Sequence, residues 1–219
     1  MESTATPVDR HAAEIGSAGP SERLPLWRDI AVTVAILCRD PLGGVRAAER
    51  RVGIEAAGGV GLALGLVADV GVVAGVALLA GGIPLPLFVQ LVLCGLAPLG
   101  AAALILSSVR RLTGRHGRLR RDLYVVGISA VPLGLAAIAV GLLGRTHGGA
   151  DALTTLAASV LSVLLLFSGC RYVLRLSTLA TVITVPLVVA AVATISAGLI
   201  GPLALMLVRA WASGAPPSS

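Results

Sequence analysis

Asp69 is a titratable residue in the middle of a long apolar stretch of sequence. It is the sole formal charge within residues 56–80. An ionisable group inside a membrane is by default a candidate functional site, because hydrocarbon solvates charge poorly. The functional interpretations are a proton relay or a cation site. The alternative is a structural hydrogen bond to a hydroxyl such as Ser129, Ser159 or Thr181, and this alternative is favoured because Asp69 has no second carboxylate or histidine at its depth.

Small residues precede Asp69 at a regular spacing of four. Gly53, Ala57, Gly61 and Gly65 would share a helix face that leads to the carboxylate. Strips of this kind allow the backbones of membrane helices to approach closely. The spacing predicts helix packing through Gly61 and Gly65, with the Asp69 side chain directed toward neighbouring helices and away from lipid.

The other reactive side chains do not form a recognisable catalytic or metal site. The three histidines fall in the N-terminal tail and in two separate polar loops. No G-x-S-x-G or H-E-x-x-H sequence occurs, and a phosphate-binding G-x-x-x-x-G-K is impossible because lysine is absent. The three cysteines, Cys38, Cys94 and Cys170, are widely scattered, which favours buried apolar residues over a disulfide or zinc framework. We expect no enzyme activity, no metal and no cofactor.

Arginine is concentrated between residues 110 and 122. Arg118, Arg120 and Arg121 follow Gly117 and could hold a lipid phosphate or an acidic partner. A role in fixing membrane topology is the simpler interpretation. Nucleic-acid binding is not expected, because aromatic residues make up only 3% of the chain and offer no stacking platform.

The composition predicts that these residues are carried by helices in lipid. Hydrophobic residues make up 56% of the 219 residues and charged residues 13%, against about 25% charged residues in soluble domains, which excludes a soluble globular enzyme. A span needs about 20 apolar residues. Five stretches qualify: 56–80, 87–109, 123–144, 152–170 and 178–200, with apolar character to 208. We therefore predict an all-α bundle of five spans within residues 53–212, between disordered tails at 1–25 and 213–219.

The distribution of arginine predicts the orientation of the bundle. With five spans, the N-terminal region shares one side with the loops at 110–122 and 171–177, which carry nearly all arginines close to the spans. The opposite side holds only Arg145 and Arg209 near the spans. By the positive-inside rule the N-terminus is cytoplasmic and the C-terminus outside. The expected location is the inner (plasma) membrane.

Residues 26–52 are neither disordered nor membrane-spanning, because the apolar run at 27–37 is too short to cross a membrane. Asp40 and Pro41 form a helix-start signal, and the helix that follows has apolar Val45 and Val52 on one face. Its basic residues are Arg46, Arg50 and Arg51. This pattern favours an amphipathic helix in the headgroup layer, with its arginines on anionic lipid. The alternative is a cytoplasmic helix packed on the end of the bundle.

Three stretches, taken in order, resemble the Yip family of small five-span membrane proteins. They are a Pro-led segment at 37–46, a glycine-led loop and span entry with a Pro at 117–132, and a Gly-then-basic turn at 161–180. The resemblance covers roughly residues 37–200 and implies a non-enzymatic five-helix protein with a cytosolic N-terminus. Eukaryotic members act in vesicle traffic with small GTPases. This lysine-free, Ala/Gly/Leu-rich chain instead looks bacterial.

These features together predict a structural or interaction protein. Its expected partners are the bilayer, anionic lipid headgroups, and a membrane-protein partner or a second copy of the chain. The alternative is a small transporter or channel component that uses Asp69 within the bundle. An intramembrane enzyme is disfavoured because no acid–base pair converges. The surroundings of Asp69, polar or filled with methyl groups, distinguish these possibilities.

Overall fold

The computed structural model describes residues 26–40, 44–115, 117–143 and 150–212. The two predicted tails lie outside these residues. The elements in chain order are α2 (Leu26–Arg39), α3 (Gly44–Leu79), α4 (Leu85–Leu112), α5 (Leu119–Leu143), α6 (Ala150–Ser168), the π-helical η1 (Gly169–Val173) and α7 (Thr178–Ala212). No strand occurs in the described ranges. The predicted all-α class is confirmed.

Five helices are long and apolar enough to cross a membrane. The candidate spans are Ala56–Leu79, Leu85–Leu112, Leu119–Leu143, Asp151–Val173 and Thr178–Leu199. They agree with the five apolar stretches of the sequence, and the chain is a multi-pass membrane protein. Beyond the fifth candidate span, α7 continues through Pro202 to Ala212 as one helix.

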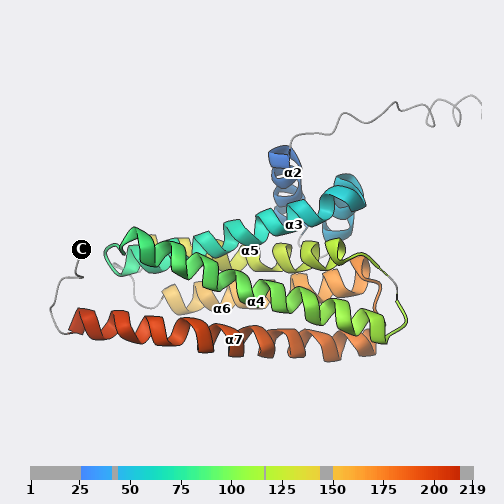
Figure 1. Ribbon diagram of the computed structural model, residues 1–219. Coiled ribbons are helices and arrows are strands. Elements are labelled where there is room, and N and C mark those ends of the chain that lie inside the picture. The colour runs from blue at the N-terminus through green and yellow to red at the C-terminus, as the bar shows by residue number, and fades with distance from the viewer. Residues whose placement is uncertain (1–25, 41–43, 116, 144–149, 213–219) are drawn as a thin grey trace, which may run out of the picture.

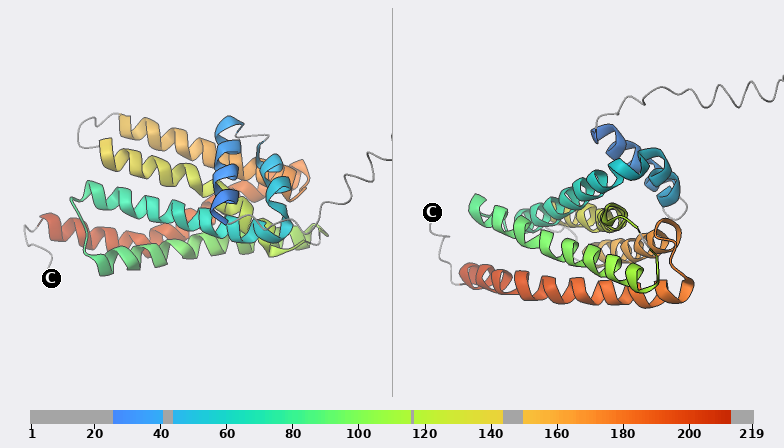
Figure 2. Two further views of the ribbon diagram at one scale, coloured as in Figure 1. Left: turned by 90° about the horizontal axis from the view of Figure 1, so that it is seen from above. Right: turned by 45° about the vertical axis from the view of Figure 1, so that its right-hand side comes forward.

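The spanning helices alternate in direction. One end of the bundle carries α2, the α4–α5 turn and η1, and the other end carries the α3–α4 turn and the C-terminal end of α7 (Figure 1). The largest interface joins α3 to α5, while α4 packs on α7 and α6 packs on α5 (Figure 2). This arrangement places the arginine-rich α4–α5 and η1–α7 connections at the same end.

Glycine and alanine bring the parallel helices α3 and α5 into backbone contact. A Cβ added to Gly127, Gly134 or Gly141 of α5 would collide with Gly61, Ala68 or Gly75 of α3, respectively. The three pairs recur every seven residues along both helices. Such a repeat keeps one seam in register between two helices that cross at a small angle. We call these six residues the glycine seam.

The glycine seam differs from the four-residue strip predicted along α3. Gly61 belongs to both, and Gly65 lies between Leu99 of α4 and Gly127 of α5. A four-residue step overshoots one helical turn by about 40°, so the strip winds away from α5 as it approaches Asp69. Asp69 consequently faces α4 and not the seam.

The segment that precedes the first span differs from the predicted amphipathic helix. Helix α3 begins at Gly44 and continues without interruption into the first span. Val45 is buried in the main core, with Ile36 of α2 and Val52 packed against that core. The side chains of Arg46, Arg50 and Arg51 lie outside the described residues. The buried Val45 agrees with the alternative of a segment packed on the end of the bundle, because a helix lying in the headgroup layer would expose this residue to lipid.

Candidate functional site

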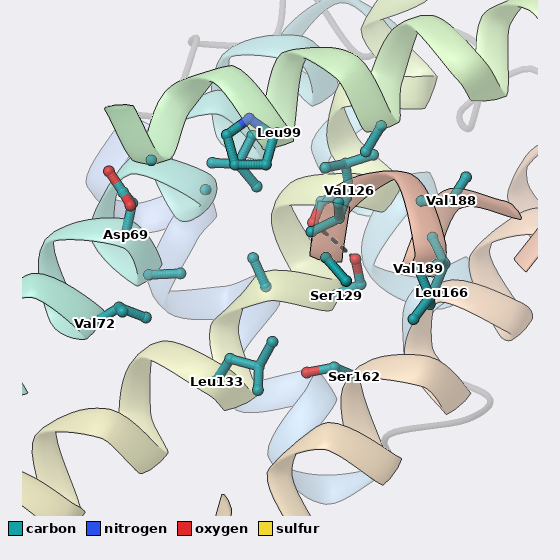
Figure 3. Close-up of a pocket in the computed structure, with 18 of the residues that line it drawn as sticks. Asp69, Val72, Leu99, Val126, Ser129, Leu133, Ser162, Leu166, Val188 and Val189 are labelled. Atoms are coloured by element: carbon teal, nitrogen blue, oxygen red, sulfur yellow. Dashed lines mark hydrogen bonds between the residues drawn. The ribbon is translucent and has the colours of Figure 1, made fainter. Parts of the chain in front are cut away.

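A cavity of about 330 Å³ lies at the centre of the bundle. All five spanning helices contribute to its wall, and Asp69, Leu99, Ser129, Ser162 and Val188 represent α3 to α7 in turn (Figure 3). Apart from Asp69 and three serines, the wall consists of apolar side chains and glycine. The five helices thus line a partly open, mostly apolar cavity with one carboxylate in its wall.

Asp69 occupies its position because residue 95 of the facing helix α4 is glycine. A Cβ built on Gly95 would overlap the Asp69 carboxylate, so any other residue there would displace this side chain. Asp69 is half-buried, and its Oδ2 atom is buried without a hydrogen-bond partner among the described residues. A carboxylate oxygen that has lost water without gaining a donor is energetically costly.

The three hydroxyls predicted as partners of Asp69 form hydrogen bonds elsewhere. Ser129 donates to the carbonyl three residues earlier at 2.8 Å. Ser159 and Thr181 donate to the carbonyls four residues earlier at 2.8 and 2.9 Å. Each bond lies within or next to the residue's own helix, a common arrangement for these side chains in apolar surroundings. The predicted structural hydrogen bond from these residues to Asp69 is therefore wrong. Ser162, which also lines the cavity, has a buried Oγ with no partner in the described part of the chain.

The cavity is partly open, and the exposed part of its wall lies on α5, α6 and α7. The most exposed large side chains of its wall are Leu133, Val163 and Val189, which are 38%, 39% and 41% exposed. Helices α6 and α7 also share only a small interface. In a membrane these exposed valines face hydrocarbon, so the opening leads to lipid.

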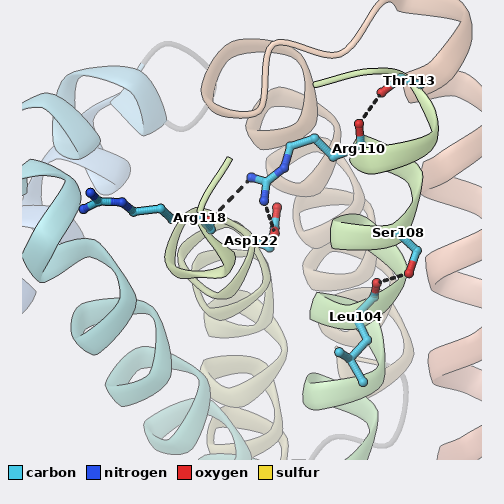
Figure 4. A network of polar contacts seen from close by, with 6 residues as sticks. All are labelled: Leu104, Ser108, Arg110, Thr113, Arg118 and Asp122. Carbon is cyan, nitrogen blue, oxygen red and sulfur yellow. Dashed lines mark hydrogen bonds and ion pairs between the residues drawn. The ribbon is translucent and has the colours of Figure 1, made fainter. Parts of the chain in front are cut away.

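A buried ion pair lies at the arginine-rich end of the bundle. Arg110 Nη2 is 2.9 Å from Asp122 Oδ2, and the two side chains are 3% and 0% exposed (Figure 4). Arg110 Nη1 also donates to the Arg118 carbonyl at 3.5 Å. The guanidinium lies against Gly117, where any Cβ would collide with it. The pair joins the end of α4 to the start of α5.

Sequence reasoning placed both members of this pair in a loop. The loop predicted at 110–122 is shorter, because α4 extends to Leu112 and α5 begins at Leu119. Arg110 and Asp122 are helical residues on either side of a short turn. A signal was present: an Arg and an Asp at the facing ends of two consecutive spans can meet when those helices are antiparallel.

The candidate lipid-binding arginines of the α4–α5 turn lie at the surface. Arg118 and Arg120 are exposed and Arg121 is half-buried. The Arg120 stem packs over Gly58 of α3. Near the α4–α5 and η1–α7 connections, the exposed arginines are Arg111, Arg115, Arg118, Arg120, Arg171 and Arg175. Together they form a basic rim around the buried ion pair.

The described residues include no group of three His, Cys, Asp or Glu side chains that could hold a metal ion.

The relation of the chain to known proteins was tested in three ways. Protein-family models, curated proteins and solved structures were each compared with the chain, and none of them matches it. The resemblance to the Yip family stays a prediction.

Proposed function

We propose that this is a non-enzymatic, Yip-like membrane protein that binds a single-chain amphiphile from the bilayer in the cavity between its five spans. The observation that carries the proposal is the apolar cavity with its opening toward lipid. Its volume lies at the lower end of the range of about 300–1,000 Å³ for ligand sites. A double-chain phospholipid is too large for it.

The physical reason is the packing of the cavity wall. Side chains that line an empty space forgo dispersion contacts on one side, and apolar cavities do not fill with water but accept apolar ligands. An alkyl chain that enters between α6 and α7 restores these contacts without leaving the hydrocarbon. The cavity would then act as a binding site for a membrane component.

Blocking the opening tests this function. Ala193 lines the cavity on α7 and is exposed, whereas Ala190 is exposed on the same helix and does not line it. In lipid nanodiscs, a photoreactive alkyl alcohol is expected to label the cavity wall saturably in the unmodified protein and in Ala190→Phe. Labelling should fall several-fold in Ala193→Phe. Non-saturable labelling that is equal in all three proteins contradicts the proposal.

The proposed orientation places the basic rim and the N-terminus in the cytoplasm of a bacterial cell, because arginine is retained on that side. Exposed Arg118 and Arg120 would lie at the membrane surface and attract anionic headgroups by about 1 kcal/mol per charge. Arg46, Arg50 and Arg51 are proposed to contribute to the same attraction. The proposed partners are thus anionic lipid and the amphiphile.

Site-directed cysteine labelling tests this topology. Single cysteines at Arg115 and Pro84, in a protein without Cys38, Cys94 and Cys170, are expected to react from opposite sides of the membrane. Arg115→Cys should be labelled from the cytoplasm, because it lies in the basic rim. Labelling of both positions from the same side would exclude the alternation of helices on which the orientation depends.

A small transporter or channel component that uses Asp69 is the second candidate function. It is favoured by the position of this carboxylate in the wall of a cavity near the middle of the spans. Measurement of proton and cation flux in proteoliposomes distinguishes the two. Binding without flux supports the binding protein, whereas flux that is lost in Asp69→Asn supports the transporter.

A further inference from the structure

We infer that the cavity selects an amphiphile whose polar group is a protonated amine, held by the carboxylate of Asp69. This inference rests on the proposed function, since it names the chemical class of the ligand for the same cavity. The alkyl chain would occupy the apolar part of the cavity and leave between α6 and α7.

The first argument is the unmet hydrogen-bonding capacity of Asp69. A carboxylate accepts hydrogen bonds at two oxygens and donates none when it is charged. Oδ2 has no donor among the described residues, although it is buried. The carboxylate torsion is soft, so rotation can turn either oxygen toward the cavity that Asp69 lines. An ammonium group brings three N–H donors to this position.

The second argument is charge complementarity. Among the described residues that line the cavity, Asp69 is the sole ionisable one, and none is arginine or histidine. Arg110, the buried arginine of the described chain, is paired with Asp122 at the end of the bundle. A cationic ligand would supply the counter-charge that the protein itself leaves out of the cavity. A phosphate or carboxylate headgroup would be repelled at the same place.

The third argument is the space that the helices leave for the carboxylate. A side chain at residue 95 of α4 would collide with the Asp69 carboxylate, so Gly95 leaves the room that the carboxylate itself occupies. The adjoining wall is formed by small or apolar residues such as Gly65, Ala68 and Val72. These apolar surroundings would strengthen the attraction between the carboxylate and an ammonium group in the cavity.

A matched pair of probes tests the inference. A photoreactive alkylamine and the alkyl alcohol of the same chain length are titrated against the full-length protein in nanodiscs of zwitterionic lipid. The amine is expected to saturate the cavity at a concentration about 10–100-fold lower than the alcohol, the factor that corresponds to a hydrogen bond with a charged group. In Asp69→Asn the amine should lose this advantage, while binding of the alcohol should stay unchanged.

Controls separate the possible failures. Asp151→Asn makes the same chemical change at the start of α6, outside the cavity, and should preserve the preference for the amine. In a protein without Cys38 and Cys94, buried Cys170 reports on folding, because a thiol-reactive dye should reach it only on unfolding. Should Asp69→Asn unfold, saturation of the unmodified protein by both probes at equal concentration would still overturn the inference.

The outcomes are distinguishable. If neither probe saturates the cavity, the proposed function fails. If both probes saturate it at equal concentration in the unmodified protein, the binding protein stands and the inference about the amine is overturned. A preference for the amine that persists in folded Asp69→Asn also overturns it, because another group must then hold the ammonium.

Discussion

Asp122→Leu is expected to lower the free energy of unfolding by about 3–5 kcal/mol, because it leaves the buried Arg110 guanidinium without its counter-charge. Arg110→Met should cost a similar amount by leaving Asp122 unpaired. The double variant should recover most of the loss, since buried ion pairs are often replaced by apolar side chains at little cost. Reversible unfolding in mixed micelles, followed by circular dichroism, measures the coupling between the two sites.

Arg111→Met is the matched control for the ion pair. Arg111 is adjacent in sequence but exposed, so its replacement should change the free energy of unfolding by less than about 0.5 kcal/mol. Additive effects of Arg110→Met and Asp122→Leu would show that the two side chains are not coupled. The prediction therefore depends on the recovery of stability in the double variant. Such a recovery would indicate that the ion pair serves to hold the α4–α5 turn in one conformation.

Gly61→Ala and Gly127→Ala are each expected to cost about 1–3 kcal/mol, because one methyl group forces apart backbones that are already in contact. The Cβ of residue 127 would collide with the Gly61 carbonyl, and that of residue 61 with the backbone of Tyr124. The helices can separate once for both methyl groups. The double variant should therefore lose less than the sum of the two single losses.

Gly100→Ala isolates the effect of the methyl group from the helix preference of alanine. Gly100 is exposed on α4, and nothing lies within 4 Å of its added Cβ. Alanine should leave the stability unchanged or raise it by up to about 1 kcal/mol. Equal behaviour of Gly100→Ala and Gly127→Ala in the unfolding experiment would refute close packing at the glycine seam.

Together, the glycine seam and the ion pair provide rigid support for the cavity. Both fix α5, which lies between α3 and α6 and carries Ser129 and Leu133 of the cavity wall. In contrast, α6 and α7 make only a small contact, and this is where we propose the entrance to the cavity. A binding site that takes its ligand from lipid requires this combination of a rigid wall and an accessible entrance.

The number and approximate limits of the spans follow from the sequence alone. A membrane imposes one physical requirement, about 20 uncharged residues in a helix that satisfies its own backbone. This requirement acts locally, so the apolar stretches predict the observed spans to within a few residues. Gly61 could also be assigned to a packing face from spacing. The seven-residue recurrence of Gly127, Gly134 and Gly141 was readable in the same way.

Contacts between spans required the tertiary structure. The absence of a hydroxyl partner for Asp69 could not be read from spacing, because hydroxyls in apolar helices can bond to their own backbone, as Ser129 and Ser159 do. The pairing of Arg110 with Asp122 depends on how far each helix extends into the turn.

Arginine at the end of a span is equally compatible with water, with a headgroup or with a buried carboxylate, so composition does not distinguish these environments. The cavity can be predicted from local sequence even less than the ion pair, because residues of five helices line it. Lipid-facing and cavity-facing side chains are alike in being apolar. Hydropathy identifies the helices that enter the membrane, whereas only their packing determines which of their apolar faces meet and where a space is left between them.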